Sequence, residues 1–307
     1  MEWIEREQAA KDRLVINKKS SSVKKERRGK AVILGTALLI ILATIAITLF
    51  LVSKGLQSFV VNGVSPIEFI SSTEWSPSNE KFGALPFIFG SFAVTVLSAL
   101  IAAPLGIGAA IFMTEIAPSW GQRILQPVVE LLVGIPSVVY GFIGLTVVVP
   151  FIRENVGGQG FGLLAGTVVL SIMILPTITS ISTDAMRSLP GGLRESSYAV
   201  GATRWQTIYR VLVPAASPVL LTAVVLGMAR AFGEALAVQM VIGNSRDIAS
   251  SLVESTGTLT TIITLNIGHT TFGSLDNNVL WSLGLILLIM SYVFIIIIRY
   301  LSSRRKI

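Results

Sequence analysis

The segment Arg187–Pro214 reads RSLPGGLRESSYAVGATRWQTIYRVLVP, and this polar stretch separates two long apolar parts of the chain. Pro190 and the two glycines after it predict a turn, because both residue types favour turn geometries. The next residues, Leu193–Val200, suit a helix of about two turns, and Gly201 supplies a favoured helix stop. The segment is therefore expected to be a structured elbow between apolar spans.

A second short helix is expected directly after Gly201. Thr203 and Gln206 have the spacing of a capping box, in which a hydroxyl and an amide side chain satisfy backbone N–H groups at a helix start. Helical spacing then places four apolar residues on one face until Pro214 interrupts the pattern: Trp205, Ile208, Val211 and Leu212. We interpret the whole segment as a docking elbow on a membrane protein.

The composition is that of a membrane-embedded chain, with a mean hydropathy of +0.75, 52% apolar residues and 13% charged residues. A helix crosses a hydrocarbon core of about 30 Å with about 20 apolar residues. Six stretches meet this requirement, and the second is long enough to need kinks near its prolines. The predicted spans are Ala31–Ser53, Phe82–Thr114, Leu125–Ile152, Phe161–Ser182, Ala215–Ile242 and Val279–Ile298. The predicted fold class is an all-α integral membrane protein.

Basic residues orient these spans. With a cytoplasmic amino terminus, the inner segments hold 19 of the 24 lysines and arginines, which fixes both ends of the chain in the cytoplasm by the positive-inside rule. The elbow at Arg187–Pro214 is then also cytoplasmic. The net charge of +7 follows from this topology and from contact with anionic lipid, so it does not imply nucleic-acid binding.

The predicted domains follow the same division. Residues 1–30 form a charged tail, expected to be partly disordered or to lie on lipid, and residues 31–53 form a retained first span. Residues 82–299 form a core of five further spans, which includes the elbow at 187–214, and residues 300–307 form a short cytoplasmic tail. The chain has no cysteine, and its one histidine, His269, lies in an expected outer loop, Gly243–Asn278, so no metal site is predicted.

Two charged residues, Arg230 and Glu234, interrupt the apolar fifth span and would share one face of a continuous helix. Each charge at mid-span costs about 2.5–3.5 kcal/mol on insertion scales, so such residues usually face a bundle interior or a wet path. Mutual neutralisation is one explanation. A substrate path is the favoured one, because apolar residues would avoid the cost altogether. A guanidinium grips phosphate-like oxygens with two donors, so Arg230 suits an oxyanion that Glu234 would help to release.

The elbow resembles the signature loop of the ABC importer permeases, in which Glu-Ala-Ala precedes a glycine, an Ile-x-Leu pair and a proline at fixed spacing. Glu195-Ser196-Ser197, Gly201, Val211 and Val213-Pro214 stand in that frame, with serine for alanine and valine for isoleucine and leucine as conservative departures. The resemblance implies type I importer architecture and a loop that docks on a separate ATPase subunit. The coupling residues it implies are Glu195, Ser196, Ser197, Gly201, Trp205, Val211 and Pro214.

A narrower resemblance covers about Phe82 to Arg299. The stretch Arg230–Val238 with Ile242-Gly243-Asn244 is similar to the fifth core segment of the PstC family of phosphate importer permeases, in which the matching arginine and glutamate are tied to phosphate passage. Membership would imply a bacterial plasma (inner) membrane location and partners of three kinds: a PstA-like sister permease, two PstB-like ATPase subunits and a PstS-like phosphate-binding protein.

The same resemblance leaves other functions open. The alternatives are a permease for molybdate or sulfate, a PstA-type subunit, and, from a different class, a secondary anion transporter or channel. The chain contains no G-x-x-x-x-G-K-[ST] sequence, so ATP and Mg²⁺ are expected on the partner ATPase and no cofactor is expected in this chain. The chain is therefore expected to be a permease subunit and not itself an enzyme.

Overall fold

The structure is a computed structural model that describes residues 2–303 of the chain. The chain divides into two compact units, Met1–Ser53 and Lys54–Ile307. Helix α1, Glu2–Gly55, forms the first unit and ends just inside the second. Of the predicted carboxyl-terminal tail, residues 304–307 lie outside the described residues.

Helix α1 carries most of the first candidate membrane span, Gly29–Val60, which extends beyond the end of this helix. The charged segment before this span is helical back to Glu2, whereas the sequence favours a partly disordered or lipid-bound tail. Lysine, glutamate, glutamine, arginine and alanine are frequent there, and all are strong helix formers. An i,i+4 ion pair between Lys30 and Glu26, with N and O 3.1 Å apart, supports the same conformation.

The second unit begins with short elements. They are α2 (Gln57–Val60), α3 (Pro66–Ser71), β1 (Trp75–Ser76), the 3-10 turn η1 (Pro77–Asn79) and β2 (Lys81–Phe82). The two strands pair antiparallel, with Trp75 opposite Phe82. Trp75 also lies edge-on to Phe87, with ring centroids 5.2 Å apart, so this small hairpin is anchored on the start of the next helix.

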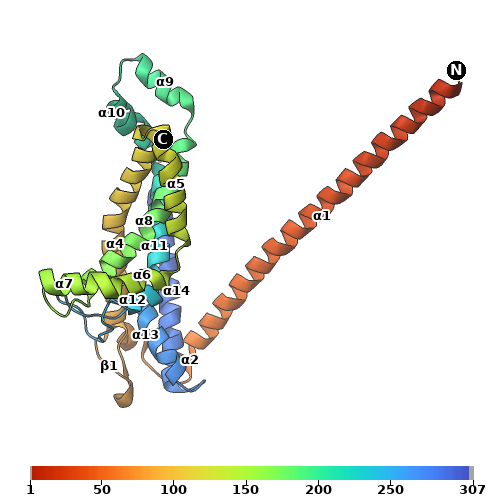
Figure 1. The fold of residues 1–307 in the computed structure, drawn as a ribbon. Coiled ribbons are helices and arrows are strands. Elements are labelled where there is room, and N and C mark those ends of the chain that lie inside the picture. Colours follow the sequence, from red (N-terminus) through yellow and green to blue (C-terminus); the bar gives the residue numbers. More distant parts are fainter. Residues whose placement is uncertain (1, 304–307) are drawn as a thin grey trace. The chain divides into compact units, whose positions relative to one another are not determined.

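The remaining elements form the helical bundle (Figure 1). They are α4 (Leu85–Ile111), the π-helical η2 (Phe112–Ile116), α5 (Ser119–Gly134), α6 (Ser137–Ile143), the π-helical η3 (Gly144–Val148), α7 (Val149–Asn155), α8 (Leu163–Arg187), α9 (Gly191–Ala199), α10 (Arg204–Thr207), the π-helical η4 (Ile208–Leu212), α11 (Val213–Phe232), α12 (Leu236–Gln239), α13 (Leu259–Asn266), the 3-10 turn η5 (Ile267–His269) and α14 (Leu275–Ser303).

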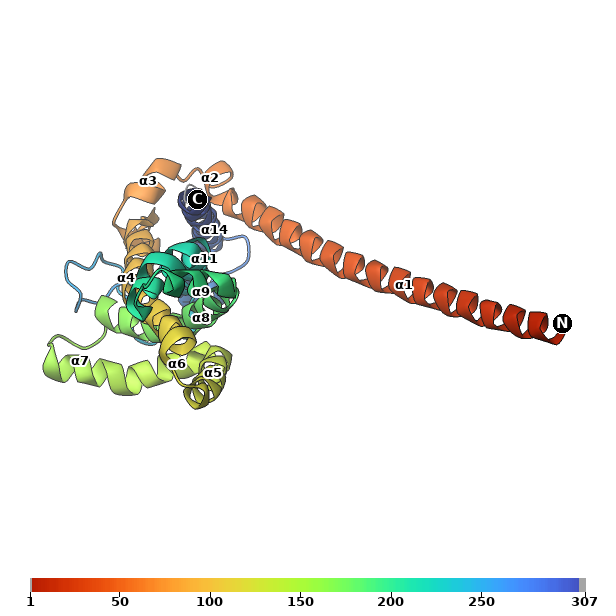
Figure 2. The ribbon, with the colours of Figure 1, turned by 90° about the horizontal axis from the view of Figure 1, so that it is seen from above.

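Helix α8 is the centre of this bundle and packs on both α4 and α11. Figure 2 looks along the bundle and shows α8 and α11 near its middle. The α8 side chains with no exposed surface include Leu170, Met173, Ile174 and Ile178. Gly106 of α4 and Gly227 of α11 both lie against Ile178, where a Cβ would come within 2.9 and 2.7 Å of its side chain. Glycine at these two positions therefore permits the close approach of three membrane helices.

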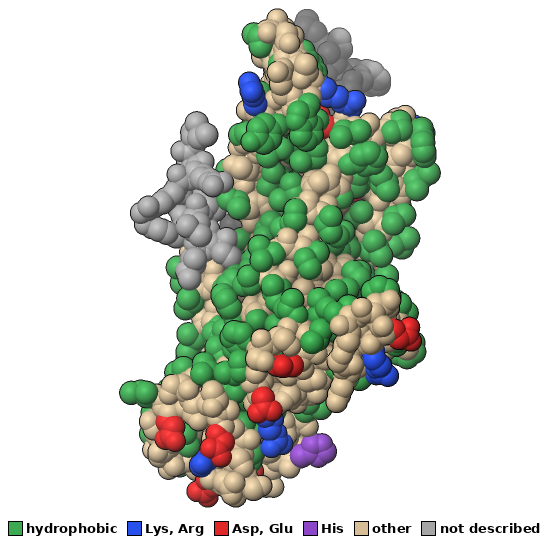
Figure 3. All heavy atoms as spheres, turned by 90° about the vertical axis from the view of Figure 1, so that its left-hand side faces the viewer, with side chains coloured by type: hydrophobic (Ala, Val, Ile, Leu, Met, Phe, Trp, Pro, Cys, Tyr) green, Lys and Arg blue, Asp and Glu red, His purple; other side chains and the backbone are tan. Residues whose placement is uncertain are grey.

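Six helical stretches are long and apolar enough to cross a membrane, as the sequence predicts. They are Gly29–Val60, Leu85–Ile116, Ser137–Asn155, Leu163–Arg187, Arg204–Phe232 and Leu275–Ile296. Hydrophobic side chains cover the middle of the face drawn in Figure 3, and charged side chains gather toward its two ends. This distribution matches a bundle whose middle faces hydrocarbon.

The third span differs from its predicted form. The sequence predicts a span over Leu125–Ile152, whereas the structure divides this stretch at Ile135 and Pro136 into α5 and the α6–η3–α7 stretch. The second part runs crosswise to α4 and α8 in Figure 1. Both Ile135 and Pro136 have extended ψ angles, as expected for a proline and the residue before it. The Tyr140 hydroxyl donates to the Leu132 carbonyl at 2.8 Å and so bridges the break.

The fifth span is continuous at its start and interrupted at its end. Helices α10, η4 and α11 form one stretch, so the prediction of a separate short helix that stops at Pro214 is wrong. The N–H of Val213 donates to the Ile208 carbonyl five residues earlier, and this wide turn accommodates a proline that has no N–H. At the other end α11 stops at Phe232, well before the predicted limit of Ile242.

The expected outer loop Gly243–Asn278 is partly a buried element. It contains α13, whose Leu259 and Thr261 have no exposed surface. The Leu259 N–H donates to the Ser91 hydroxyl on α4 at 2.9 Å, and Gly90 lies against the Gly257 carbonyl with no room for a Cβ. A run of Thr, Ser and Gly thus packs into the bundle instead of being solvated as a whole.

Candidate substrate path and coupling loop

Arg230 lies in the last turn of α11 and is half-buried. Its Nη1 donates to the Thr177 hydroxyl of α8 at 2.8 Å. The phenol of Tyr140 on α6 lies within electrostatic range of the guanidinium. Three helices therefore converge on this arginine. A guanidinium has five N–H donors, and within residues 2–303 the hydrogen bond of Arg230 is the one to Thr177, so most of these donors remain for another group.

Glu234 does not lie on the same helix face as Arg230. The helix ends at Phe232, and the Glu234 carboxylate accepts a hydrogen bond from the Ala237 N–H at 3.0 Å, at the start of α12. Its backbone carbonyl accepts one from the Thr260 hydroxyl of α13 at 2.8 Å. Across the side chains that the structure describes, Arg230 forms no ion pair with Glu234. The prediction that both residues share one helix face is therefore wrong, because a helix end separates them. The alternative explanation, mutual neutralisation of the two charges, does not describe this structure either.

The sequence did not single out Thr177 or Tyr140. Both lie in other predicted spans, and neither departs from the pattern of small and aromatic residues around it. Tyr140 is buried and Thr177 is half-buried, and their positions near an intramembrane arginine follow from how α6 and α8 pack. A positive charge with free donors and neutral hydroxyl neighbours is an arrangement suited to a tetrahedral oxyanion.

The coupling loop is the segment Arg187–Pro214, and most of its predicted local structure is confirmed. Helix α9 ends before Gly201, whose φ of +81° is the left-handed conformation that favours glycine. Thr203 and Gln206 form the expected capping box: the Gln206 N–H donates to the Thr203 hydroxyl at 3.3 Å, and the Gln206 amide oxygen accepts from the Thr203 N–H at 2.8 Å.

The predicted coupling residues divide into exposed and buried positions. Glu195, Ser196, Gly201, Trp205 and Pro214 are exposed, Val211 is half-buried, and Ser197 is buried. The Ser197 hydroxyl lies 2.9 Å from the Thr207 hydroxyl, so it holds α9 against α10. Trp205 is 66% exposed while Ile208 and Leu212 are buried, so the apolar residues predicted to share one face are only partly covered by the rest of the chain.

Arg194 and Glu115 are functional candidates that the sequence reasoning missed. The Arg194 guanidinium donates two hydrogen bonds to the Glu115 carboxylate, from Nη2 and, at 3.2 Å, from Nε. Glu115 belongs to η2 at the end of α4, whereas Arg194 belongs to α9. The hydrogen bonds to Glu115 raise the pKa of Arg194 above its ordinary value, so the arginine is cationic at any physiological pH.

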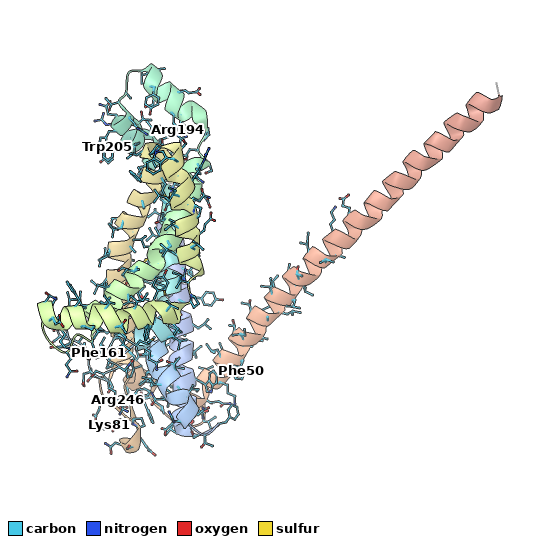
Figure 4. All side chains as sticks on the ribbon, in the orientation of Figure 1. Phe50, Lys81, Phe161, Arg194, Trp205 and Arg246 are labelled. Carbon is cyan, nitrogen blue, oxygen red and sulfur yellow. The ribbon has the colours of Figure 1, made fainter. Side chains whose placement is uncertain are left out.

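The two charged ends of the second unit are distinct. Arg194 and Trp205 lie at one end of the bundle in Figure 4, and Lys81 and Arg246 lie at the opposite end. At that opposite end, a pocket of about 260 Å³ is lined in part by Gln239 and Asn244. In the part of the chain that the structure describes, no group of three or more His, Asp or Glu side chains is placed to hold a metal ion.

Comparison with known proteins identifies relatives over most of the chain. The family described as "Binding-protein-dependent transport system inner membrane component" matches residues 102–307. The "Probable ABC transporter permease protein YqgH" of Bacillus subtilis (strain 168) is 71% identical over 92% of each chain. The "Phosphate transport system permease protein PstC" of Mesorhizobium japonicum is 38% identical over 87% of this chain and 86% of its own.

Solved structures agree on the fold. The permease chain in an inward-facing structure of the MetNI methionine ABC transporter superposes with a TM-score of 0.56 at 24% identity. The match covers 71% of this chain and 94% of that chain. At this identity the likeness shows the fold, which is that of a type I ABC importer permease.

Proposed function

The chain belongs to the family of binding-protein-dependent transport system inner membrane components, and we propose that it is the permease subunit of an ATP-driven phosphate importer. It is a multi-pass membrane protein of the ABC importer permease class. Phosphate is the proposed substrate because several relatives at 32–38% identity over most of the chain are named as phosphate permeases. The structural observation that supports it is Arg230, a half-buried cation with a neutral hydroxyl as its bonded neighbour.

Arg230 would contact phosphate during passage. Its bidentate donors match two phosphate oxygens, and a permanent positive charge offsets the loss of water around the anion. Passage also requires release, and a single arginine held by Thr177 binds more weakly than a closed cluster of cations. Glu234 would act indirectly: its carboxylate fixes the start of α12 and so the break in the chain directly after Arg230.

The coupling loop would dock on an ATPase partner that binds ATP and Mg²⁺. Glu195 and Ser196 of α9 and Trp205 of α10 are exposed, as a docking surface requires. The ATPase is cytoplasmic, which agrees with the excess of basic residues on the loop side and puts both chain ends there. A sister permease and an external phosphate-binding protein, of the PstA and PstS kinds, would complete the importer.

In this proposal the chain works by alternating access. ATP binding draws two ATPase subunits together, the coupling loops move with them, and the helices around Arg230 open toward the outside. Hydrolysis returns the inward-facing state. The chain itself supplies the path and the loop, while the energy comes from the partner.

Uptake of labelled inorganic phosphate tests this function. A strain lacking this gene, with the partner subunits present, receives the wild type, Arg230→Gln, Arg230→Lys or the control Arg153→Gln at matched membrane levels. Arg153 is exposed and donates to the Gln159 carbonyl, so its loss removes an equal charge away from the proposed path. We expect the wild type and the control to restore uptake, Arg230→Gln to lower it at least tenfold, and Arg230→Lys to retain part of it.

Competing functions give different results in the same strain. Restoration of sulfate or molybdate uptake without phosphate uptake would reassign the substrate. Uptake that continues without the ATPase subunit would indicate a secondary transporter or channel. Equal uptake by Arg230→Gln and the wild type would remove Arg230 from the path.

A further inference from the structure

The Arg194–Glu115 ion pair joins two elements that are far apart in the sequence. Arg194 also donates from Nη2 to the Met186 carbonyl at the end of α8, at 3.3 Å. One side chain on α9 therefore contacts both η2, which directly follows α4, and the last turn of α8. In the described residues, the side-chain hydrogen bonds from α9 to elements outside the coupling loop are those of Arg194.

The Arg194–Glu115 ion pair lies in largely buried surroundings, which strengthen it. The side chains of Glu115 and Arg194 are 8% and 27% exposed. A buried apolar cluster lies at the same end of the bundle and comprises Ala185, Met186, Ile208, Leu212, Ala216 and Leu220, with Leu193 of α9 packed against it. Ionic hydrogen bonds are stronger in such low-dielectric surroundings than at the surface, and removing one partner leaves a buried charge unpaired.

Neighbouring residues on α9 point in opposite directions. Arg194 and Leu193 face the bundle, whereas Glu195 and Ser196 are exposed on the proposed docking face. A force applied to the exposed face of this short helix therefore acts on α4 through Arg194. The receiving residue, Glu115, lies in the π-helical η2, and wide turns of this kind are frequent where helices change shape for function.

The other polar link at this end is weaker. Arg187, the last residue of α8, donates to the Gln126 side chain of α5 at 2.7 Å, and Gln126 donates to Glu130 at 3.0 Å. Arg187 and Glu130 are exposed, and exposed links of this kind contribute little. This link also bypasses α9. The buried contact between the Ser197 and Thr207 hydroxyls ties α9 to α10 and so to α11. Among the described residues, the side-chain hydrogen bonds that join α9 to the end of α4 are those of Arg194.

We propose that the Arg194–Glu115 ion pair is the positioning contact through which movement of the coupling loop is transferred to α4. This proposal rests on the proposed function in one respect, since it requires an ATPase partner that moves the loop. Arg194 and Glu115 touch neither substrate nor nucleotide in this role. The two residues determine whether α4 moves when α9 moves.

Coupling of ATP hydrolysis to substrate is the first test. Complexes with the partner subunits, in lipid nanodiscs, are assayed for ATP hydrolysis without and with phosphate-loaded binding protein. We expect Glu115→Gln and Arg194→Met to lower the ratio of stimulated to basal hydrolysis at least fivefold, while basal hydrolysis and subunit assembly persist. Arg194→Lys keeps a charge on one donor atom and should retain an intermediate ratio. The exposed outer pair, Lys81 and Glu74, supplies the matched control, since Lys81→Gln should leave the ratio unchanged.

Exchanging the two charges distinguishes a role in positioning α4 from a role in folding alone. If Glu115→Gln fails to assemble, the double variant Glu115→Arg with Arg194→Glu decides the matter, because it restores an ion pair between the same two elements. An exchanged variant that assembles and recovers at least a third of the wild-type ratio supports the proposal. An exchanged variant that assembles and stays uncoupled overturns it.

Movement can be measured without any transported substrate. The chain has no cysteine, so spin labels can be attached to cysteines introduced at Ala199 on α9 and at Leu105 on α4, each paired with a reference label at Glu154. In the assembled complex, a non-hydrolysable ATP analogue should change both distances in the wild type. In Glu115→Gln, only the Ala199 distance should change.

The outcomes distinguish the two proposals. An unchanged Leu105 response in Glu115→Gln, or no Leu105 response in the wild type, overturns the transfer through this ion pair. If the labels respond as expected but the wild type carries no phosphate, the phosphate assignment fails and the ion-pair proposal stands.

Discussion

Two arginine–glutamate combinations in this molecule show that closeness along the chain and contact in the structure can disagree. Arg230 and Glu234 are four residues apart and do not pair, because α11 ends between them. Arg194 and Glu115 are 79 residues apart and form a two-point ion pair. The first arginine keeps free donors for a ligand, whereas the second is committed to a carboxylate. Spacing along the chain therefore does not decide which charge is structural and which is available.

The largest effect is expected at the paired site. Glu115→Gln should lower the free energy of unfolding by about 2–3 kcal/mol, because it leaves Arg194 partly buried without its counter-charge; the 27% exposure of Arg194 keeps the loss below the full range for a buried pair. Denaturant unfolding in mixed micelles measures the loss. A loss as small as that of an exposed pair would mean that water reaches Glu115.

A smaller effect is expected at Arg230 when its hydrogen-bond partner Thr177 is changed. Thr177→Val removes the acceptor that positions Arg230, and a hydrogen bond to a charged group contributes about 1.5–3 kcal/mol. Because Arg230 is only half-buried, we expect the lower end of that range, which is a roughly tenfold loss of phosphate uptake at low concentration. Thr177→Ser is the control, since it keeps the hydroxyl. Equal loss in both variants would contradict the hydrogen-bond explanation.

Glu234 should behave as a cap and not as a counter-ion. Glu234→Ala removes the acceptor for the Ala237 N–H and should cost about 1 kcal/mol of stability. Glu234→Gln retains an amide oxygen and should lose less than Glu234→Ala. If Glu234 instead neutralised Arg230, both substitutions would be equally harmful, and comparison of their unfolding curves tells the two cases apart.

The carboxylate of Glu254 accepts hydrogen bonds from neutral donors, and its pKa should depend on them. Hydrogen bonds from the backbone and hydroxyl of Ser250 hold the pKa of Glu254 below its ordinary value. The lowered pKa means that the associated stability is present above the unfolded-state pKa and is lost as the pH falls through the folded value. NMR titration should show the Glu254 pKa rising toward its ordinary value in Ser250→Ala. Because alanine keeps the backbone N–H, the absence of any rise would mean that the hydrogen bond from the Ser250 hydroxyl is not maintained in solution.

The exposed ion pair between Lys81 and Glu74 should contribute almost nothing to the stability of the fold. Lys81 and Glu74 approach to 2.8 Å with about half of each side chain exposed, and the carboxylate raises the pKa of Lys81. Surface pairs of this kind contribute little because water and salt screen them. Lys81→Gln should leave the unfolding midpoint unchanged within error at 150 mM salt. A clear shift would show that exposure alone does not separate strong pairs from weak ones here.

The sequence predicts what local patterns encode. Apolar length indicates six spans, the Thr203–Gln206 spacing predicts the capping box, and Gly201 predicts the helix stop. It does not predict the end of α11 at Phe232, because Gly233 is a weak signal within an apolar run and the break is stabilised by Thr260, which is distant in sequence. Arg194 and Glu115 each read as ordinary charges at the edge of a span. Only the packing of α4 against the coupling loop brings them together.

The three π-helical segments η2, η3 and η4 have one feature in common: Pro118, Pro150 or Pro214 follows each within two residues. A π turn holds one residue more than an α turn. A deletion of one residue within Ile208–Leu212 would therefore convert the turn to α geometry and leave both flanking helices in register. The same deletion in the middle of α8 would rotate every later side chain by about 100°. A deletion in η4 would thus preserve the register, but it would also remove the wide turn that accommodates Pro214.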